Sequence, residues 1–120
     1  MIAAVRSDSH IWLAAHWDGK SWSLVPSPAP RVVSGLYATA ALGPSDVLAV
    51  GTFLQPRTYN FLTLVMRWDG GSWRTIASEN VAGAFDNRLE GLAVTAGRQF
   101  AVGTSAGPEG EKTLIVERCP

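Results

Sequence analysis

Carboxylates and aromatic side chains recur together in this sequence, and they are the first candidates for chemistry. Asp18 and Asp69 each stand in a Trp-Asp-Gly-x-Ser-Trp segment, at residues 17–22 and 68–73. Two carboxyl groups about 5 to 10 Å apart are the arrangement that hydrolyses glycosidic bonds. Asp-Gly is also a favoured pair for a tight hairpin, because glycine readily adopts positive φ. Since the two aspartates hold equivalent places in successive copies, we interpret them as turn residues and not as a catalytic pair.

Four of the five tryptophans flank these two turns. Indole rings can form a platform for stacking sugars, but packing between repeated units also places aromatic residues at identical repeat positions. We therefore predict a structural role for the tryptophans. The structural positions of the repeat are then Trp17, Asp18, Gly19, Trp22, Trp68, Asp69, Gly70 and Trp73.

The remaining residues contain no pattern typical of a metal site or of a catalytic nucleophile. His10 and His16 are the only histidines, and neither has a partner at metal-ligand spacing. Cys119 is the single cysteine, so an internal disulfide is excluded and the redox compartment is undetermined. There is also no nucleophile elbow and no glycine-rich phosphate loop that opens a helix. The sequence predicts a chain that is not an enzyme, with no metal and no cofactor.

The overall composition narrows the classes of partner. Ten basic and ten acidic residues give a formal net charge of zero, which disfavours nucleic acid and anionic membrane surfaces as partners. No apolar run approaches the roughly 18 residues of a membrane-spanning helix, and the first residues are too short for a signal-peptide core. We expect a soluble chain without an export signal. Its 120 residues, 47% of them hydrophobic, suit one domain with a core.

Three separate elements of the sequence repeat with the same period. Residues 16–25 match residues 67–76, residues 46–52 match residues 98–104, and residues 63–65 match residues 113–115. The offsets are 51, 52 and 50, as seen from Trp17 to Trp68, Ala49 to Ala101 and Thr63 to Thr113. A period near 51 residues falls in the range of propeller repeats.

Each period is predicted to hold four short strands and no helix. The apolar runs are five to seven residues long, rich in β-branched and aromatic residues, and separated by Gly, Pro, Asp and Ser. The middle copy is expected to form strands at residues 35–41, 47–52, 61–68 and 72–77. The copies on either side are partial, with strands at residues 2–5, 11–17 and 21–25 before it and at residues 89–95, 99–104 and 113–117 after it.

The predicted fold class is therefore all-β, with four-stranded antiparallel blades of the β-propeller type in an incomplete ring. One repeat domain covers residues 1–120, divided into a partial blade at 1–34, a complete blade at 35–88 and a partial blade at 89–120. Incomplete blades leave open faces and unpaired edges, which favour association. We expect either self-association or a chain that is part of a longer protein.

The connections differ in length between the two ends of the predicted blades. Residues 43–46 and the two Asp-Gly segments make tight turns, whereas residues 26–31, 53–60, 78–88 and 105–112 are expected to form longer loops that emerge on the other face. Arg57, Tyr59 and Asn60 combine a guanidinium, an amphipathic ring and an amide on one such loop, a mixture common at interfaces. They are the predicted contact residues. Glu109, Glu111 and Lys112 are expected to form a solvated loop tip.

With these strands and turns placed, the sequence resembles the bacterial kelch-like repeat, of the type found in the central domain of galactose oxidase. The likeness rests on residues 47–51 and on the Arg-Trp-Asp-Gly and Ser-Trp segments near residues 67–73, although only Gly51 and Gly103 stand where kelch repeats have a double glycine. Such families mostly bind proteins or glycans, and an extracytoplasmic parent protein fits the resemblance. The copper ligands of the oxidase have no match at any position of this chain.

Three functions remain open at this stage. The first is a non-catalytic module that binds protein or carbohydrate through its long loops. The second is a lobe of a glycan-acting enzyme, for which the innermost predicted strands offer only Leu36, Tyr37, Thr39 and Glu90. The third is a structural unit that completes a larger propeller. The ligand and the compartment stay undetermined.

Overall fold

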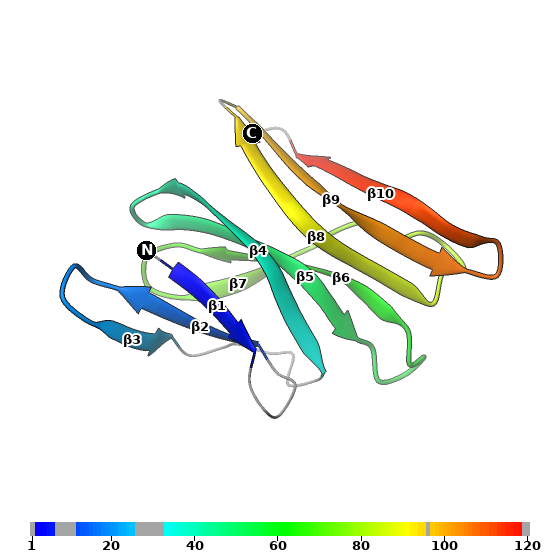
Figure 1. The fold of residues 1–120 in the computed structure, drawn as a ribbon, viewed down its shortest axis with the longest axis horizontal. Helices are drawn as coiled ribbons and strands as arrows, with labels where there is room; N and C mark the ends of the chain where they lie inside the picture. Colours follow the sequence, from blue (N-terminus) through cyan, green and yellow to red (C-terminus); the bar gives the residue numbers. More distant parts are fainter. Residues whose placement is uncertain (1, 7–11, 26–32, 96, 119–120) are drawn as a thin grey trace.

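The computed structural model describes residues 2–6, 12–25, 33–95 and 97–118, and within them the secondary structure is entirely β (Figure 1). The all-β class predicted from the sequence is confirmed. The ten strands are β1 (Ile2–Arg6), β2 (Trp12–Trp17), β3 (Trp22–Val25), β4 (Ser34–Gly43), β5 (Asp46–Leu54), β6 (Phe61–Trp68), β7 (Trp73–Ile76), β8 (Asp86–Thr95), β9 (Arg98–Gly107) and β10 (Gly110–Arg118).

Each strand pairs with its chain neighbour in three antiparallel groups. β1 to β3 form a separate three-stranded sheet, β4 to β7 form a four-stranded meander, and β8 to β10 form a three-stranded meander. One parallel bridge, between Phe61 of β6 and Asp86 of β8, joins the last two groups into a seven-stranded sheet. This bridge is possible because β7 pairs only with Val65–Trp68 and leaves the first residues of β6 free on that edge. No sheet among the described residues closes on itself.

The expectation of a long loop at residues 105–112 is wrong. β9 continues to Gly107 and β10 begins at Gly110, so only Pro108 and Glu109 make the turn. Gly110 has a φ of 100°, which allows the chain to reverse within two residues. The composition of this segment suggested a loop, but ladder hydrogen bonds need backbone groups and not apolar side chains. The expected loop at residues 26–31 lies outside the described residues.

The three groups of strands lie face to face in a row. One face of the β4–β7 group forms a buried cluster of Val47, Ala49, Leu64, Met66, Trp68 and Trp73. This face looks toward the first sheet, since β1 and β2 lie against β4 and the His16 ring lies 6.4 Å from the Trp68 ring. The opposite face packs on the β8–β10 group through a second cluster of Val50, Leu89, Ala101 and Leu114. Alternation of side chains along each strand supplies both faces.

Two equivalent glycines allow two close approaches between neighbouring strands. A Cβ on Gly51 would overlap the carbonyl oxygen of Gly35, and a Cβ on Gly103 would overlap that of Arg88. A register shift lies directly beside each contact, between Leu36 and Ala38 in β4 and between Leu89 and Gly91 in β8. The glycine of the repeat is therefore required by the backbone geometry of a bulge.

We predict that Gly103→Ala lowers the free energy of unfolding by about 1 to 3 kcal/mol, because the new methyl group displaces β8 from β9. Gly43→Ala is the matched control, since a Cβ at Gly43 meets open space, and it should change stability by less than about 1 kcal/mol. Urea unfolding of both variants is the measurement. Equal stability of the two variants would contradict the close approach.

Candidate functional site

The two Trp-Asp-Gly-x-Ser-Trp segments form the same turn in the structure. In the first, the Asp18 carboxylate accepts hydrogen bonds from the backbone N–H groups of Lys20 and Ser21, at 2.8 and 2.9 Å. In the second, the Asp69 carboxylate accepts from Gly71 and Ser72, both at 2.9 Å.

The next residue of each turn, Gly19 or Gly70, has a φ near 100° (101° and 100°). Each aspartate carboxylate is thus bound by backbone N–H groups of its own turn.

The tryptophans that flank each turn pack against one another across the hairpin. Trp17 pairs with Trp22 and Trp68 pairs with Trp73, with ring centroids 5.6 and 5.7 Å apart and tilted at 48° and 51°. Tilted contacts at this separation are a favourable aromatic geometry. The second pair is buried, at 7% and 5% exposed, whereas Trp22 is 49% exposed.

The backbone hydrogen bonds in these turns lower the pKa of both aspartates. For Asp18 the bond from Ser21 has the largest effect and that from Lys20 the next, and for Asp69 the order is Gly71 and then Ser72. A carboxylate whose pKa is lower in the folded state stabilises the fold above its unfolded pKa, near 3.9, and loses that contribution as the pH falls through the folded pKa.

We predict that the melting temperature falls as the pH is lowered below about 4, and that the combined variant Asp18→Asn and Asp69→Asn falls less. An asparagine keeps an oxygen acceptor in the turn and does not titrate. Thermal unfolding followed by circular dichroism from pH 7 to pH 2 is the measurement. Glu79→Gln with Glu111→Gln is the control, and an identical acid profile in both double variants would refute the role of the turns.

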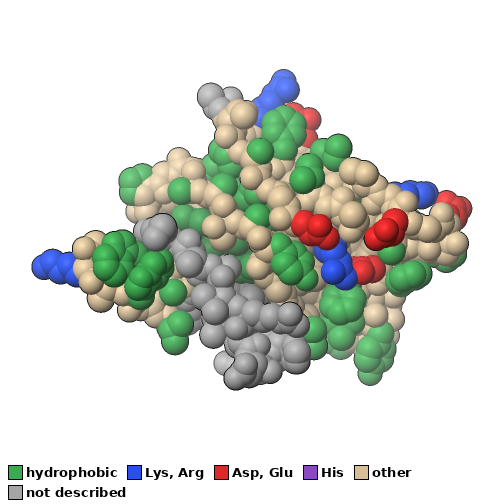
Figure 2. All heavy atoms as spheres, viewed as in Figure 1, with side chains coloured by type: hydrophobic (Ala, Val, Ile, Leu, Met, Phe, Trp, Pro, Cys, Tyr) green, Lys and Arg blue, Asp and Glu red, His purple; other side chains and the backbone are tan. Residues whose placement is uncertain are grey.

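Several groups named in the sequence analysis have no site around them in the structure. No group of three or more His, Cys, Asp or Glu side chains is placed to hold a metal ion within the described ranges. His16 instead packs on Trp68. Among the described residues no helix has the length and apolar character needed to cross a membrane. On the face drawn in Figure 2, acidic and basic side chains stand in small mixed groups among apolar and neutral ones.

The side of the molecule where β4, β6 and β8 begin and β5 ends carries the candidate site. We call it the loop end, and define it by residues 33–37, 52–63 and 78–90. These strand ends gather on one side of the molecule in Figure 1. Buried polar side chains collect at or near this end: Ser34, Thr52, Thr63, Asn87 and Ser105.

Asn87 is the centre of the buried polar network. Its side chain is fully buried; its Nδ2 donates to the Phe61 carbonyl at 3.1 Å, and its Oδ1 accepts from the Val81 N–H at 2.9 Å. Its own carbonyl lies 2.8 Å from the hydroxyl of Thr52, which can donate to it. One residue thereby ties the starts of β6 and β8 to the end of β5 and to the 77–85 loop.

A second set of bonds holds the loop that leads from β7 to β8. The Thr63 N–H donates to the Asn80 side-chain oxygen at 2.7 Å, and the Thr63 hydroxyl lies 2.6 Å from that of Ser78 and 3.0 Å from the Glu79 carbonyl. The loop is therefore fixed against β6 by polar contacts, which explains how it keeps its shape with few large apolar side chains.

We predict that Asn87→Ala lowers the free energy of unfolding by about 1 to 3 kcal/mol, because it removes the side-chain bond to the half-buried Phe61 carbonyl and leaves the half-buried Val81 N–H without its partner. Thr58→Ala removes an exposed hydrogen bond to Gln55 and should cost about 0.5 kcal/mol or less. Chemical denaturation of both variants makes the comparison. Equal effects would show that the Asn87 network does not hold the loop end.

A groove of about 280 Å³ opens at the loop end between the starts of β4 and β8. Its lining residues are Val33, Ser34, Gly35, Leu36, Tyr37, Thr52, Phe61 and Arg88. The hydroxyl of Ser34 is buried and has no hydrogen-bond partner among the described residues. Tyr37 is half exposed, at 50%, and offers both its ring and its hydroxyl. The accessible surface of the groove therefore offers the ring and hydroxyl of Tyr37, with the unpartnered Ser34 hydroxyl buried beneath it.

The positive charge of Arg88, which lines the groove, is paired with the carboxylate of Asp86. Its guanidinium makes two bonds to the Asp86 carboxylate, at 3.2 Å from Nε and 2.6 Å from the second nitrogen. The hydrogen bonds to Asp86 raise the pKa of Arg88, and the nearby charges of Asp86 and Glu90 add to this effect. Arg88 thus stays charged and is held in place. The pair combines the hydrogen-bond donors of the guanidinium with the acceptor oxygens of the carboxylate.

The predicted contact residues lie on the loop that joins β5 to β6, which starts beside the groove. Leu54 donates to the Val33 carbonyl and Phe61 lines the groove, so the loop between them emerges at its rim. Arg57 and Tyr59 are exposed and Asn60 is half-buried. Gln55 and Asn60 close the loop through a backbone bond of 2.8 Å. Whether these residues bind a partner stays a prediction.

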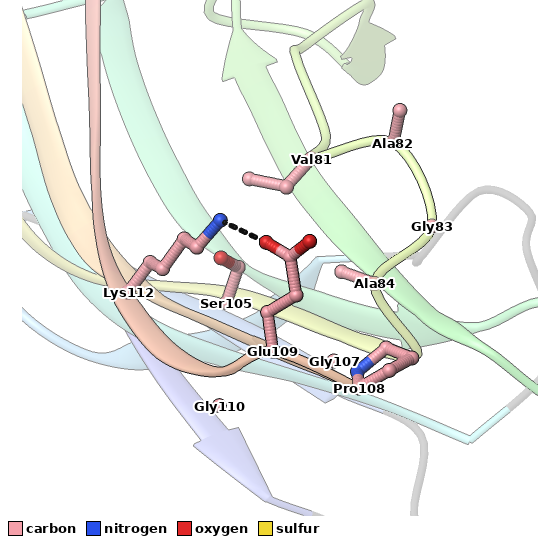
Figure 3. A pocket seen from close by; sticks show the side chains of 10 residues that line it. All are labelled: Val81, Ala82, Gly83, Ala84, Ser105, Gly107, Pro108, Glu109, Gly110 and Lys112. Carbon is pink, nitrogen blue, oxygen red and sulfur yellow. Dashed lines mark hydrogen bonds and ion pairs between the residues drawn. The ribbon is translucent and has the colours of Figure 1, made fainter.

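A second cavity, of about 220 Å³, lies between the 81–84 segment and the β9–β10 hairpin (Figure 3). Figure 3 shows Lys112 and Glu109 turned toward one another, and their side chains form an ion pair at 3.0 Å. Both side chains are largely exposed, at 54% and 82%. The charges at this cavity neutralise each other in water, and we place no site there.

Sequence reasoning missed the groove residues Ser34 and Arg88 and the buried amide of Asn87. Ser34 and Asn87 hold equivalent positions at the starts of β4 and β8, but this equivalence follows from the strand pairing, and the residue types alone gave no signal of it. No protein-family model, no curated protein and no solved structure matches this chain.

Proposed function

We propose that this chain is a non-catalytic recognition module built of propeller-type blades, and that it binds carbohydrate at its loop end. One observation carries the proposal. Tyr59 is 78% exposed. Among the described residues it is the one non-glycine residue with positive φ, at 57°.

The left-handed backbone of Tyr59 costs conformational free energy, and its exposed side chain does not offset this cost by burial. Left-handed backbone costs a residue with a Cβ about 1 kcal/mol or more, which is why glycine or asparagine usually occupies it. Strain of this kind gathers at binding sites, where the surrounding structure holds the residue in place. Here the Tyr59 N–H donates to the Gln55 carbonyl at 2.9 Å, and the ring is held out into solvent.

The groove beside this loop suits a sugar ring. Sugar hydroxyls both donate and accept hydrogen bonds, and the groove offers the hydroxyl of Tyr37 and the guanidinium of Arg88, which Asp86 holds in place. The half-exposed ring of Tyr37 supplies an apolar surface for the face of a sugar. The volume of about 280 Å³ suits one small group more than an extended polymer.

The blade architecture is part of the same proposal. It is supported by the four-stranded meander of β4 to β7, by the repeat near 51 residues and by the stacking of three strand groups in a row. In such folds loops at one end of the blades carry recognition, while the strands supply a rigid support.

We predict that Tyr59→Gly raises the stability of the fold by up to about 1 kcal/mol and abolishes binding to oligosaccharides. Binding is screened on an array of neutral and sialylated oligosaccharides and then measured by calorimetry with the strongest neutral hit. Tyr59→Phe keeps the ring and the backbone strain, and should retain binding within about tenfold. If the wild-type chain binds none of these sugars, the proposal of carbohydrate recognition is wrong, and protein partners are to be tested instead.

A structural role in assembly is the second candidate, and a separate observation favours it. Large apolar side chains are exposed on the sheets at both ends of the row, and Trp22, Leu24, Val102 and Ile115 are among them. Exposed apolar surface of this kind marks interaction sites.

A further inference from the structure

The first and third strand groups each expose an apolar face that points away from the middle group. On the first sheet, Trp22 is 49% and Leu24 is 72% exposed, and both lie on one face because they are two residues apart in β3. We call this surface, with Trp17, the tryptophan face. On the third group, Val102 is 44% and Ile115 is 63% exposed, and the two residues are paired across β9 and β10. We call this surface the isoleucine face.

The repeat shows what such surfaces look like when they are covered. Trp73, which is equivalent to Trp22, is 5% exposed, and Val50, which is equivalent to Val102, is 1% exposed. Val65, equivalent to Ile115, is paired with Val50 and packs into the cluster between the second and third groups. Where a neighbouring group lies over them, the positions of Trp22 and Val102 are therefore buried and that of Ile115 is half-buried, whereas Thr75, which is equivalent to Leu24, stays exposed.

The covered interfaces also show which surface meets which. The Val50 face of the middle group lies on the third group, against Leu89, Ala101 and Leu114. The Trp68 face of the middle group meets the first sheet through His16, on the face of β2 opposite to Trp17. In both interfaces the isoleucine-type surface of one group covers the tryptophan-type surface of the next group.

We propose that the isoleucine face of one copy of this chain covers the tryptophan face of a second copy. The chain carries both halves of an interface that it already makes between its own groups, so a second copy supplies each missing half. The contact joins unlike surfaces, and it closes when two copies use both faces at once. Two such copies bring six strand groups together, within the range of four to eight blades that closed propellers use.

The association does not depend on carbohydrate recognition. Stacking buries the sheet faces, whereas the groove and the 55–60 loop lie at strand ends. The apolar side chains named on the two end faces stand on paired strands, whose backbone is already ordered before association.

The mass in solution tests the proposal on the full 120-residue chain. Light scattering behind a sizing column, at a series of concentrations, is expected to show a shift from 12.8 kDa toward twice that mass, 2 × 12.8 = 25.6 kDa. A mass of 12.8 kDa at every concentration would overturn the proposal. A continuous rise beyond the dimer would also overturn it, because the ring would not close.

Two exposed substitutions identify the surfaces without disturbing the core. Trp22→Lys and Ile115→Glu each place a charge in the proposed interface, and each is expected to weaken dimerisation by about tenfold or more. Ala82→Lys adds a charge to an exposed loop away from both faces and should dimerise like the wild type. Circular dichroism checks the folding of all three variants, which is expected to be retained because the substituted side chains are exposed.

Mixing the two interface variants distinguishes unlike from like contacts. In a mixed dimer of Trp22→Lys with Ile115→Glu, one interface is wild type and the other places a lysine opposite a glutamate. The mixture should therefore form more dimer than either variant alone. If Trp22→Lys abolishes association while Ile115→Glu has no effect, the tryptophan faces meet each other and the proposed contact is wrong.

Discussion

The buried side-chain amide of Asn87 holds together the part of the structure on which the candidate site depends. Among the described residues the second and third strand groups share one backbone bridge, between Phe61 and Asp86, so their relative orientation depends on side-chain contacts as well. The Asn87 side chain adds bonds to the Phe61 carbonyl and to the Val81 N–H, in a position with no access to water. Because a buried amide without partners is costly, this arrangement is specific: other orientations of the two groups would lose these bonds. The groove lies between β4 and β8, so its shape depends on this orientation of the two groups.

The repeat preserves backbone geometry more closely than it preserves charge. Both strand glycines sit beside a register shift, and both approach a backbone carbonyl where no Cβ fits. The ion pairs are not kept in the same way: Asp46 pairs with Arg67 at 2.7 Å, whereas the equivalent positions hold Arg98 and Glu117, with the signs exchanged and a separation of 3.7 Å. Half-exposed pairs of this kind contribute little to stability, so either sign is tolerated. Gly51 and Gly103, in contrast, cannot be replaced by a residue with a Cβ unless the neighbouring backbone moves.

This difference explains which features could be predicted from the sequence. The strands follow from local runs such as residues 47–52, and the turns at Asp18 and Asp69 follow from the positive φ of the glycine that comes next. The groove could not be predicted, because Ser34 and Arg88 meet only through the packing of separate strands. The hairpin at residues 105–112 was misjudged for a related reason: its glycines and serine favour a loop locally, and only pairing with β8 and β10 makes β9 continue. Tertiary pairing thus overrides local composition.

Stacking of the strand groups separates the sheet faces, which we propose for assembly, from the strand ends, which we propose for recognition. Side chains along a strand point to the two faces of its sheet, so apolar residues such as Trp73 and Val50 decide how the groups stack. Loops leave the sheet at the strand ends, perpendicular to that stacking direction, and their residues can change without disturbing either cluster. Tyr59 illustrates the consequence. Its left-handed backbone is tolerated because the cost stays within a loop closed by its own hydrogen bonds, while the stability of the fold comes from the faces. A strained, exposed aromatic residue can therefore persist at the end of a scaffold whose core it does not touch.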